Sequence, residues 1–248
     1  MTFNDQNIIV TGASSGIGKA LCEAFLKEGA TVLAVARTMS QTTLKHPNLH
    51  TLDLDLSDVS SVDRLFEEAQ KTLSTIDMFV ANAGFSYYER LDTPDYDHIR
   101  RLMGLNLDNV IYSAVKMKAY HQDAPFRFVT IASAMSFVSM PGHALYAASK
   151  AGLRGFFDSY RLEMNNDQHL HVVYPVATKT NFFNVANTER KPWPVQTVDQ
   201  VVKATLKGIQ RNQHHIHPSK IFKYSHRFIP WFFKFYVWRE TKFFKQDV

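Results

Sequence analysis

Residues 8–25 read IIVTGASSGIGKALCEAF, which is an apolar run, a glycine-rich bend and then a helical pattern. The apolar run is rich in β-branched side chains, as buried strands are, and the helical period starts at Gly16. A glycine-rich bend between a strand and a helix directs backbone N–H groups at a phosphate. The stretch therefore predicts an α/β fold that binds a phosphate-bearing ligand.

Apolar runs and helical patterns alternate along most of the remaining chain. The runs that we interpret as strands cover 8–11, 31–36, 49–54, 78–81, 126–132 and 169–174. The helical patterns cover 16–27, 59–73, 96–122 and 146–165, and we expect the third to bend near Asn106. Short, nearly continuous apolar runs are typical of a parallel sheet buried on both faces. The alternation predicts a doubly wound, Rossmann-like parallel sheet with ligands at the carboxyl ends of the strands.

The composition fits one domain with one core, since the chain has 248 residues and 45% of them are hydrophobic. We expect a dinucleotide-binding and catalytic domain over 1–218 and an appended segment over 219–248. The single cysteine, Cys22, excludes an internal disulfide and a cysteine-based metal cluster. The few residues before the first strand form no secretory signal pattern, so the sequence predicts a cytoplasmic protein.

The net charge of +5 comes from the C-terminal segment. Residues 220–248 hold seven Lys or Arg side chains and two acidic ones, and the rest of the chain is formally neutral. A nucleic-acid-binding domain needs a basic face on its folded body. The charge pattern therefore gives no support to nucleic-acid binding by the body, and we predict none.

Two phosphate-binding motifs compete for the bend. A Walker A loop would need glycine at Ala13 and Ser or Thr at Ala20, so that interpretation fails. The glycines Gly12, Gly16 and Gly18 are spaced G-x3-G-x-G, which departs from the usual dinucleotide fingerprint but leaves its physics available. The first would allow the sharp turn, the second the approach of a pyrophosphate, and the third close packing of helix on sheet. From these residues alone, a plain strand–helix turn stays the alternative.

Six motifs follow one another in a specific order along the chain. They are TGASSGIG (11–18), ANAG (81–84), LNL (105–107), IAS (131–133), YAASK (146–150) and YPVATKT (174–180). In order and spacing the chain resembles the short-chain dehydrogenase/reductase family over about residues 5–210. The resemblance implies an oxidoreductase that transfers hydride between a nicotinamide dinucleotide and a carbonyl or alcohol.

The resemblance also implies which residues hold the dinucleotide. They are Gly12, Ser14, Ser15, Gly16, Ile17, Gly18, Arg37, Asp55, Leu56, Asn82, Ala83, Gly84, Tyr146, Lys150, Pro175, Ala177, Thr178 and Thr180. Asp55 and Leu56 resemble the family's adenine contacts, with Asp53 as the alternative if the register is off by two. The turn at 82–84 would pass under the adenosine ribose, and Thr180 would contact the carboxamide.

The end of the second predicted strand favours NADP(H) over NAD. An NAD enzyme places an acidic residue there for the ribose hydroxyls, whereas an NADP enzyme supplies a cation for the 2′-phosphate. Here Ala36 ends the strand, Arg37 follows it, and the stretch 30–49 contains no carboxylate. Ser15 stands where the family often carries another cation, so the preference rests on Arg37 alone. A solvated Arg37, and with it an enzyme that prefers NAD, stays the alternative.

Tyr146 and Lys150 carry the predicted proton transfer. Four residues apart, they lie on one face of a helix. An ammonium beside a phenol favours the phenolate, so we expect Lys150 to bring the pKa of Tyr146 down toward neutral pH. Ser133 would orient the substrate carbonyl, and Asn106 resembles the family's asparagine that bends its helix and holds a water in the proton relay. A mid-helix Asn106 without a chemical role is the alternative.

The loop after the sixth strand departs from the family pattern. The family has Pro-Gly there, where this chain has Pro175 and Val176. A β-branched residue disfavours positive φ, so we expect the loop beside the nicotinamide to run differently.

The eleven histidines suggest no metal site. Three of them, His214, His215 and His217, cluster in a predicted strand. The histidines show no consistent ligand spacing with carboxylates or cysteine, so we predict no metal and interpret the cluster as surface or interface residues.

The segment 219–248 is aromatic and basic. It holds 11 aromatic residues, most of its Lys and Arg side chains fall within one arc of a helical plot, and Pro230 is expected to kink it. Its apolar stretch is too short to span a bilayer. The pattern is typical of a helix lying in a membrane surface. Packing over the substrate loop, or against a second subunit of a homo-oligomer, is one alternative, and a disordered segment is the other.

We expect large apolar side chains around the substrate. Those predicted to wall the pocket are Phe85, Met135, Phe137, Met140, Phe182, Phe183 and Trp193, and 187–196 is the best candidate for a mobile loop. Such a wall favours a hydrophobic ketone or alcohol of lipid or steroid size. The resulting hypothesis is an NADPH-dependent carbonyl reductase in the cytoplasm or at the inner membrane surface. The alternative, an NADPH-binding sensor or docking module without turnover, is disfavoured by the intact Ser133, Tyr146 and Lys150.

Overall fold

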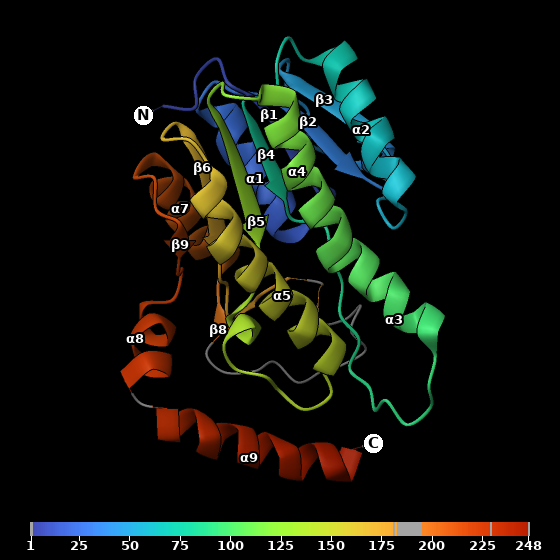
Figure 1. Cartoon of the computed structure of the whole chain (residues 1–248), viewed down its shortest axis with the longest axis vertical. Coiled ribbons are helices and arrows are strands. Elements are labelled where there is room, and N and C mark those ends of the chain that lie inside the picture. Colours follow the sequence, from blue (N-terminus) through green and yellow to red (C-terminus); the bar gives the residue numbers. More distant parts are fainter. Residues whose placement is uncertain (1, 181, 183–194, 229, 248) are drawn as a thin grey trace.

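The computed structural model describes residues 2–180, 182, 195–228 and 230–247, and its centre is a seven-stranded sheet (Figure 1). The strand order is β3-β2-β1-β4-β5-β6-β9, and neighbouring strands are parallel. The strands are β1 (Asn7–Thr11), β2 (Thr31–Ala36), β3 (Leu49–Asp53), β4 (Met78–Ala81), β5 (Phe126–Ile131), β6 (Gln168–Val173) and β9 (His215–Ile216). The predicted doubly wound fold is confirmed. The strand order reverses between β1 and β4, and ligands bind at such a reversal.

Helices cover both faces of the sheet (Figure 1). They are α1 (Gly16–Lys27), α2 (Val59–Thr72), α3 (Tyr96–Met103), α4 (Asn109–His121), α5 (Ala144–Tyr160) and α7 (Val198–Gln210). Alternate side chains of β1 enter opposite cores: Ile9 packs with residues of α2, α4 and α5, whereas Ile8 and Val10 pack with residues of α1 and α7. Burial on both faces explains why the strands read as continuous apolar runs.

The helix predicted over 96–122 breaks where expected. A π-helical turn, Gly104–Asp108, joins α3 to α4 and contains Asn106. The Asn106 amide pairs with the backbone of Phe85, in the segment that follows β4. The bend is thus fixed by a side chain that reaches the segment after β4, at the carboxyl edge of the sheet.

A second sheet of two short strands follows β6. It pairs β7 (Ala177–Thr178) with β8 (Val195–Gln196) in parallel. Gln196 Nε2 donates to Thr178 Oγ1 at 3.1 Å, which ties the two strands together. The mobile loop predicted over 187–196 ends in β8, and its residues 187–194 lie outside the described residues.

The C-terminal segment forms two helices, α8 (Lys220–Phe228) and α9 (Pro230–Asp247). Pro230 is the first residue of α9, where the missing N–H of proline leaves no helical hydrogen bond unmade. The break expected at Pro230 is therefore present. In Figure 1, α9 crosses one end of the molecule at a steep angle to α8. None of the helices, as far as the chain is described, combines the length and apolar character needed to cross a membrane.

Candidate active site

A cavity of about 820 Å³ opens at the carboxyl edge of the sheet. Its walls come from the segments that follow β1, β2, β3, β4, β5 and β6, and from α5. The predicted dinucleotide-binding and catalytic residues line this one cavity, except Gly18 and Asn106, which are buried beside it. Residues that are far apart in the sequence thus meet around one space.

Close backbone contacts shape the glycine-rich bend after β1. Gly12 has a φ of +64°, and a Cβ on it would lie 2.8 Å from Asn82 Nδ2. A Cβ on Gly18 would collide with the Gly12 carbonyl oxygen, so α1 approaches the strand only without a side chain there. Asn82 holds this arrangement by donating to the carbonyl oxygens of Thr11 and Gly12 at 3.0 and 3.1 Å. The packing agrees with the roles predicted for Gly12 and Gly18.

The N-terminus of α1 faces the cavity. Ser15 is its N-cap residue, and the Ser15 side chain makes no hydrogen bond to the first turn. Ser14, Gly16 and Ile17 line the cavity beside it. The first N–H groups of a helix carry partial positive charge and bind anions well. This end of α1 therefore fits the pyrophosphate of a dinucleotide.

The two carboxylates predicted as alternative adenine contacts lie in different places, near the carboxyl ends of β2 and β3. Asp55 lines the cavity, and its Oδ1 accepts from the N and Oγ of Ser57 at 3.0 and 2.7 Å. Asp53 instead accepts from the Oγ and N of Ser40 at 2.6 and 2.8 Å, and these bonds lower the pKa of its carboxyl. Arg37 is exposed and also lines the cavity. The placement supports Asp55 over Asp53 as the adenine contact.

Ser133, Tyr146 and Lys150 meet on one wall of the cavity. Ser133 caps a short 3-10 turn directly after β5, and its side chain hydrogen-bonds the Tyr146 hydroxyl. Lys150 lies one turn farther along α5. Its Nζ lies 5.6 Å from the centre of the Tyr146 ring and donates to the Ile131 carbonyl at 2.9 Å. The structure thus brings the predicted serine, tyrosine and lysine together.

Burial dominates the protonation of this group. It raises the pKa of the Tyr146 phenol to about 12, and the Ser133 hydroxyl opposes the rise. It also lowers the pKa of Lys150 to about 8. The expectation that the pKa of Tyr146 lies near neutral pH is wrong, because removal of the phenol from water by burial outweighs the effects that lower its pKa. Tyr146 is therefore a neutral phenol at pH 7.

Asn106 is fully buried and does not reach the cavity. Its Oδ1 accepts from the Phe85 N at 3.0 Å, and its Nδ2 donates to the Phe85 carbonyl at 2.7 Å. Gly84 lies between it and Lys150, since a Cβ on Gly84 would be 3.0 Å from Asn106 Oδ1 and 3.7 Å from Lys150 Nζ. Asn106 uses both ends of its amide on the backbone. It positions the segment after β4 and does not line the cavity.

The segment after β6 runs along the same wall. The predicted cofactor residues of this segment that line the cavity are Pro175, Ala177, Thr178 and Thr180. The φ of Val176 is not positive, and Thr178 Oγ1 donates to the Val176 carbonyl at 2.9 Å. The chain therefore accommodates Pro-Val in place of Pro-Gly without the left-handed backbone that a branched side chain resists.

Four side chains predicted to wall the substrate pocket do line the cavity, and they are Phe85, Met135, Met140 and Phe182. The prediction for Phe137 is wrong. Its ring packs 4.8 Å from the Tyr174 ring and joins the core, with the Arg154 guanidinium 4.6 Å from its centre. Phe183 and Trp193 lie outside the described residues.

The C-terminal helices also contribute to the cavity, which no motif had indicated. Phe222 of α8 and Tyr236 of α9 line it. The ring of Phe244 holds α9 against the body through an edge-on contact with Tyr88 at 5.5 Å, and the Arg90 guanidinium lies 5.3 Å from the Phe244 ring. One face of α9 therefore packs over the cavity, which is one of the alternatives predicted for this segment.

His143 is a buried polar residue on the same wall. Its Nδ1 lies 3.1 Å from both Ser86 Oγ and the Tyr87 carbonyl oxygen. Burial lowers the pKa of the ring, so His143 is neutral at pH 7. An isolated histidine carries no motif, and its place just ahead of Tyr146 at the start of α5 is the only sequence signal that points to it.

Comparison with known proteins identifies the family. A family model described as short chain dehydrogenase matches residues 6–191. The chain belongs to this family. It is therefore an oxidoreductase of the short-chain dehydrogenase type, as the six motifs predicted.

Individual relatives and solved structures extend the likeness. The chain is 25% identical over 245 residues to 11-beta-hydroxysteroid dehydrogenase 1A of Arabidopsis thaliana, a match that covers 88% of this chain and 70% of the relative. A short chain dehydrogenase from Burkholderia cenocepacia in complex with NADP matches in structure with a TM-score of 0.81 and 22% identity, covering 97% of this chain and 99% of that chain. One from Burkholderia phymatum in complex with NAD matches with a TM-score of 0.79 and 17% identity, covering 93% and 96%. The fold is therefore shared between proteins with either cofactor.

Proposed function

We propose that this short-chain dehydrogenase reduces an apolar ketone with NADPH, or oxidises the corresponding alcohol, with Tyr146 as the acid–base group. The observation that carries the proposal is that Ser133, Tyr146 and Lys150 wall the same cavity as the glycine-rich bend. A proton donor therefore faces the space in which a dinucleotide and a carbonyl compound would meet.

The bound cofactor supplies the hydride, and the protein supplies the proton. The Ser133 side chain, hydrogen-bonded to the Tyr146 hydroxyl, orients the carbonyl oxygen toward the phenol. Because burial raises the pKa of Tyr146 to about 12, the phenol is protonated at pH 7 and acts as the general acid of the reduction. The Lys150 ammonium, 5.6 Å from the ring centre, stabilises the phenolate that remains. The arrangement favours the reductive direction near neutral pH.

Replacing Tyr146 with Phe tests the proposal. We expect kcat for ketone reduction to fall by about 10²- to 10⁴-fold, while the Kd for NADPH stays as in the wild type. Tyr120→Phe, on the exposed side of α4, is the matched control and should keep full turnover. A Tyr146→Phe enzyme that reduces ketones at the wild-type rate would contradict the mechanism and favour the sensor.

The preference for NADP(H) is supported by Arg37. This exposed guanidinium follows β2 and lines the cavity near Asp55, where a 2′-phosphate would offer it two oxygens. We expect Arg37→Ala to raise the Kd for NADPH about tenfold and to leave the Kd for NADH unchanged, measured by the fluorescence of the bound reduced nicotinamide. Arg64→Ala, at a position on α2 that does not line the cavity, is the control. Equal affinity of the wild type for both cofactors would overturn the preference.

The substrate end of the cavity supports an apolar ligand. Its large apolar and aromatic side chains are Phe85, Met135, Met140, Phe182, Phe222 and Tyr236. A relative named as a hydroxysteroid dehydrogenase supports a substrate of comparable size. We expect kcat/KM to be higher for long-chain and polycyclic ketones than for small polar keto acids, with NADPH absorbance as the readout. A higher kcat/KM for small polar keto acids would contradict the proposed apolar substrate but not the proposed role of Tyr146.

The outer face of α9 supports contact with a membrane surface. Tyr236 is 7% exposed and faces the body, whereas Trp231, Phe235 and Trp238 are 70%, 57% and 52% exposed. The Nζ of Lys242 lies 4.0 Å from the centre of the Trp238 ring. Exposed aromatic rings with lysines beside them are typical of a helix that lies in the lipid interface. We infer that α9 rests on the cytoplasmic face of a membrane and admits an apolar substrate to the cavity that it lines.

A further inference from the structure

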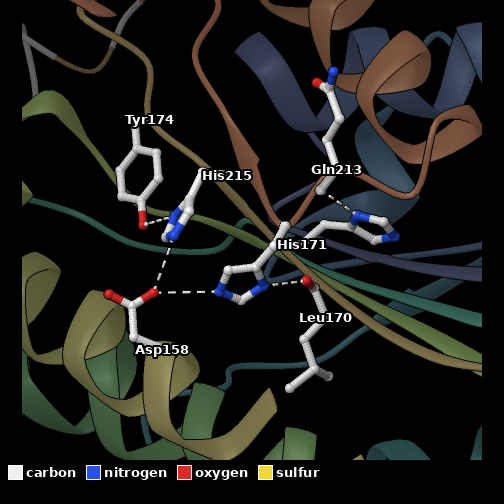
Figure 2. A network of polar contacts seen from close by, with 7 residues as sticks. Asp158, Leu170, His171, Tyr174, Gln213 and His215 are labelled. Carbon is white, nitrogen blue, oxygen red and sulfur yellow. Dashed lines mark hydrogen bonds and ion pairs between the residues drawn. The ribbon is translucent and has the colours of Figure 1, made fainter. Parts of the chain in front are cut away.

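A second cluster of chemically reactive side chains lies apart from the cavity, where the end of α5 meets the edge strand β9. Asp158 of α5 faces His215, and the Tyr174 hydroxyl points toward the same ring (Figure 2). One oxygen, Asp158 Oδ1, lies 3.2 Å from His214 Nε2 and 3.3 Å from His215 Nε2. The three ligand atoms all lie within 4.8 Å of one another. None of these three residues lines the active-site cavity.

The hydrogen bonding of His214 calls for a positive charge, either a proton or a metal ion, between its Nε2 and the carboxylate. His214 Nδ1 lies 2.6 Å from the Leu170 carbonyl oxygen, which only accepts, so Nδ1 carries a proton. The neutral ring then turns the lone pair of Nε2 toward the lone pairs of Asp158 Oδ1. Either a second proton on the ring or a metal ion between the two atoms resolves this repulsion.

The spacing fits a metal ion. Zinc binds imidazole nitrogen and carboxylate oxygen at about 2.0–2.1 Å in a tetrahedron, which sets neighbouring ligand atoms about 3.3 Å apart. The two oxygen–nitrogen separations, 3.2 and 3.3 Å, match that edge. His215 Nδ1 lies 3.0 Å from the hydroxyl of the buried Tyr174. A second-nitrogen hydrogen bond to an oxygen, present in both rings, is the usual outer contact of metal-binding histidines.

We propose that Asp158, His214 and His215 bind a divalent transition-metal ion of the Zn²⁺ class. Two imidazoles and one carboxylate favour Zn²⁺ over Mg²⁺ or Ca²⁺, which prefer oxygen ligands. The side chains of Asp158 and His215 are each 39% exposed, which leaves room for water as a fourth ligand.

The ion ties the helix that carries Tyr146 and Lys150 to the edge of the sheet. Asp158 lies two turns beyond Lys150 on α5, and Tyr174 directly precedes the cavity-lining Pro175. The sequence predicts no metal because the histidines show no consistent ligand spacing with carboxylates or cysteine. Asp158 enters the cluster from a helix more than 50 residues earlier in the chain.

Titration of the full, chelator-treated chain with Co²⁺ alone tests the site. We expect one equivalent to bind and to give the visible absorption band of tetrahedral Co²⁺ with nitrogen ligands, and Zn²⁺ to displace it. Asp158→Asn and His214→Gln should each weaken binding by at least about 100-fold, and Tyr174→Phe by about tenfold. His169→Gln removes an imidazole from the same sheet without touching Asp158, and it should bind Co²⁺ as the wild type does.

Zinc should also raise the Tm of the wild type and of His169→Gln, and leave the Tm of Asp158→Asn unchanged. Absence of the Co²⁺ band in the wild type would overturn the proposal and identify the cluster as an imidazolium–carboxylate ion pair. Equal Co²⁺ affinity of the wild type and Asp158→Asn would overturn it as well. The wild-type spectrum alone can overturn the proposal, so the test does not depend on whether every variant folds.

Discussion

The glycine-rich bend and α9 border the same cavity by different physical means. At the bend, backbone packs against backbone and one side-chain amide: a Cβ on Gly12 would lie 2.9 Å from Ala83 Cα and 2.8 Å from Asn82 Nδ2, and one on Gly18 would collide with the Gly12 carbonyl oxygen. At α9, side chains meet side chains, with Tyr236 on the cavity and Phe244 against Tyr88. Only glycine satisfies the first kind of contact, whereas many aromatic arrangements satisfy the second. The first therefore leaves a readable motif, and the second does not.

The difference also separates what each region tolerates. A methyl group at the bend changes the backbone on which the dinucleotide would lie. A substitution on α9 changes the size and polarity of one wall and leaves the rest of the cavity in place. Substitutions at the bend should therefore act on cofactor binding, and those on α9 on substrate or membrane binding.

The largest effect on cofactor binding is expected at the bend, from Gly12→Ala. The φ of +64° resists a side chain, and the Cβ would lie 2.8 Å from Asn82 Nδ2, so the turn must open. We expect affinity for NADPH to fall by at least about 100-fold, measured by cofactor fluorescence. Gly155→Ala is the control because a Cβ there meets nothing within 4 Å in the middle of α5. It should leave NADPH affinity unchanged and raise the free energy of unfolding by about 0.5–1 kcal/mol.

The next effect is a pH dependence set by Lys150 at the same end of the molecule. Burial lowers its pKa from 10.5 to about 8, so the free enzyme loses this positive charge above pH 8. We expect kcat/KM for reduction to be level below pH 8 and to fall about tenfold per pH unit above it. A profile that stays level to pH 10 would show that the lysine charge takes no part.

The same shift predicts how stability changes with pH. Between pH 8 and 10.5 the unfolded chain keeps a proton that the folded chain has lost, so the free energy of unfolding rises with pH in that window. Lys150→Met should abolish turnover, remove this rise, and stabilise the fold at pH 7 by up to about 3 kcal/mol. Denaturant unfolding at pH 7 and pH 10 measures both effects. If the methionine variant is less stable, the hydrogen bond from Lys150 to the Ile131 carbonyl stabilises the fold by more than burial of the ammonium destabilises it.

The features that could be predicted from the sequence are those that depend on residues close together in the chain. The strand runs, the bend at Asn106, and the Tyr146–Lys150 spacing depend on burial periodicity, helix geometry and short motifs, and the structure contains all three. Three other placements depend on tertiary contacts. Asp53 hydrogen-bonds Ser40, Phe137 packs against the core, and Tyr236 lines the cavity. No local pattern encodes those contacts. The pKa of Tyr146 departs from the expected value for the same reason, because burial of the phenol is a tertiary effect.

A smaller effect is expected on the inner face of α9. Tyr236→Ala removes a ring that lines the cavity, so the KM for a long-chain or polycyclic ketone should rise about tenfold with little change in NADPH affinity. Trp231→Ala, which is 70% exposed on the same helix, should leave that KM unchanged in detergent-free buffer. If both substitutions raised KM equally, the proposal that only the inner face of α9 contacts the substrate would be contradicted.

The smallest effect tests the outer face of α9. Trp238→Ser removes one aromatic ring that is 52% exposed and lies beside Lys242, so binding to vesicles of anionic phospholipid should weaken about three- to fivefold in a sedimentation assay. The KM for a water-soluble ketone should stay as in the wild type, because this ring does not line the cavity. Tyr120→Ser, on α4, is the matched control for loss of an exposed aromatic and should sediment like the wild type. A wild-type chain that stays in the supernatant at every lipid concentration would remove the membrane from the proposal. The cavity contact of Tyr236 would remain, and α9 would then be a wall of the substrate pocket with a solvent-facing outer side.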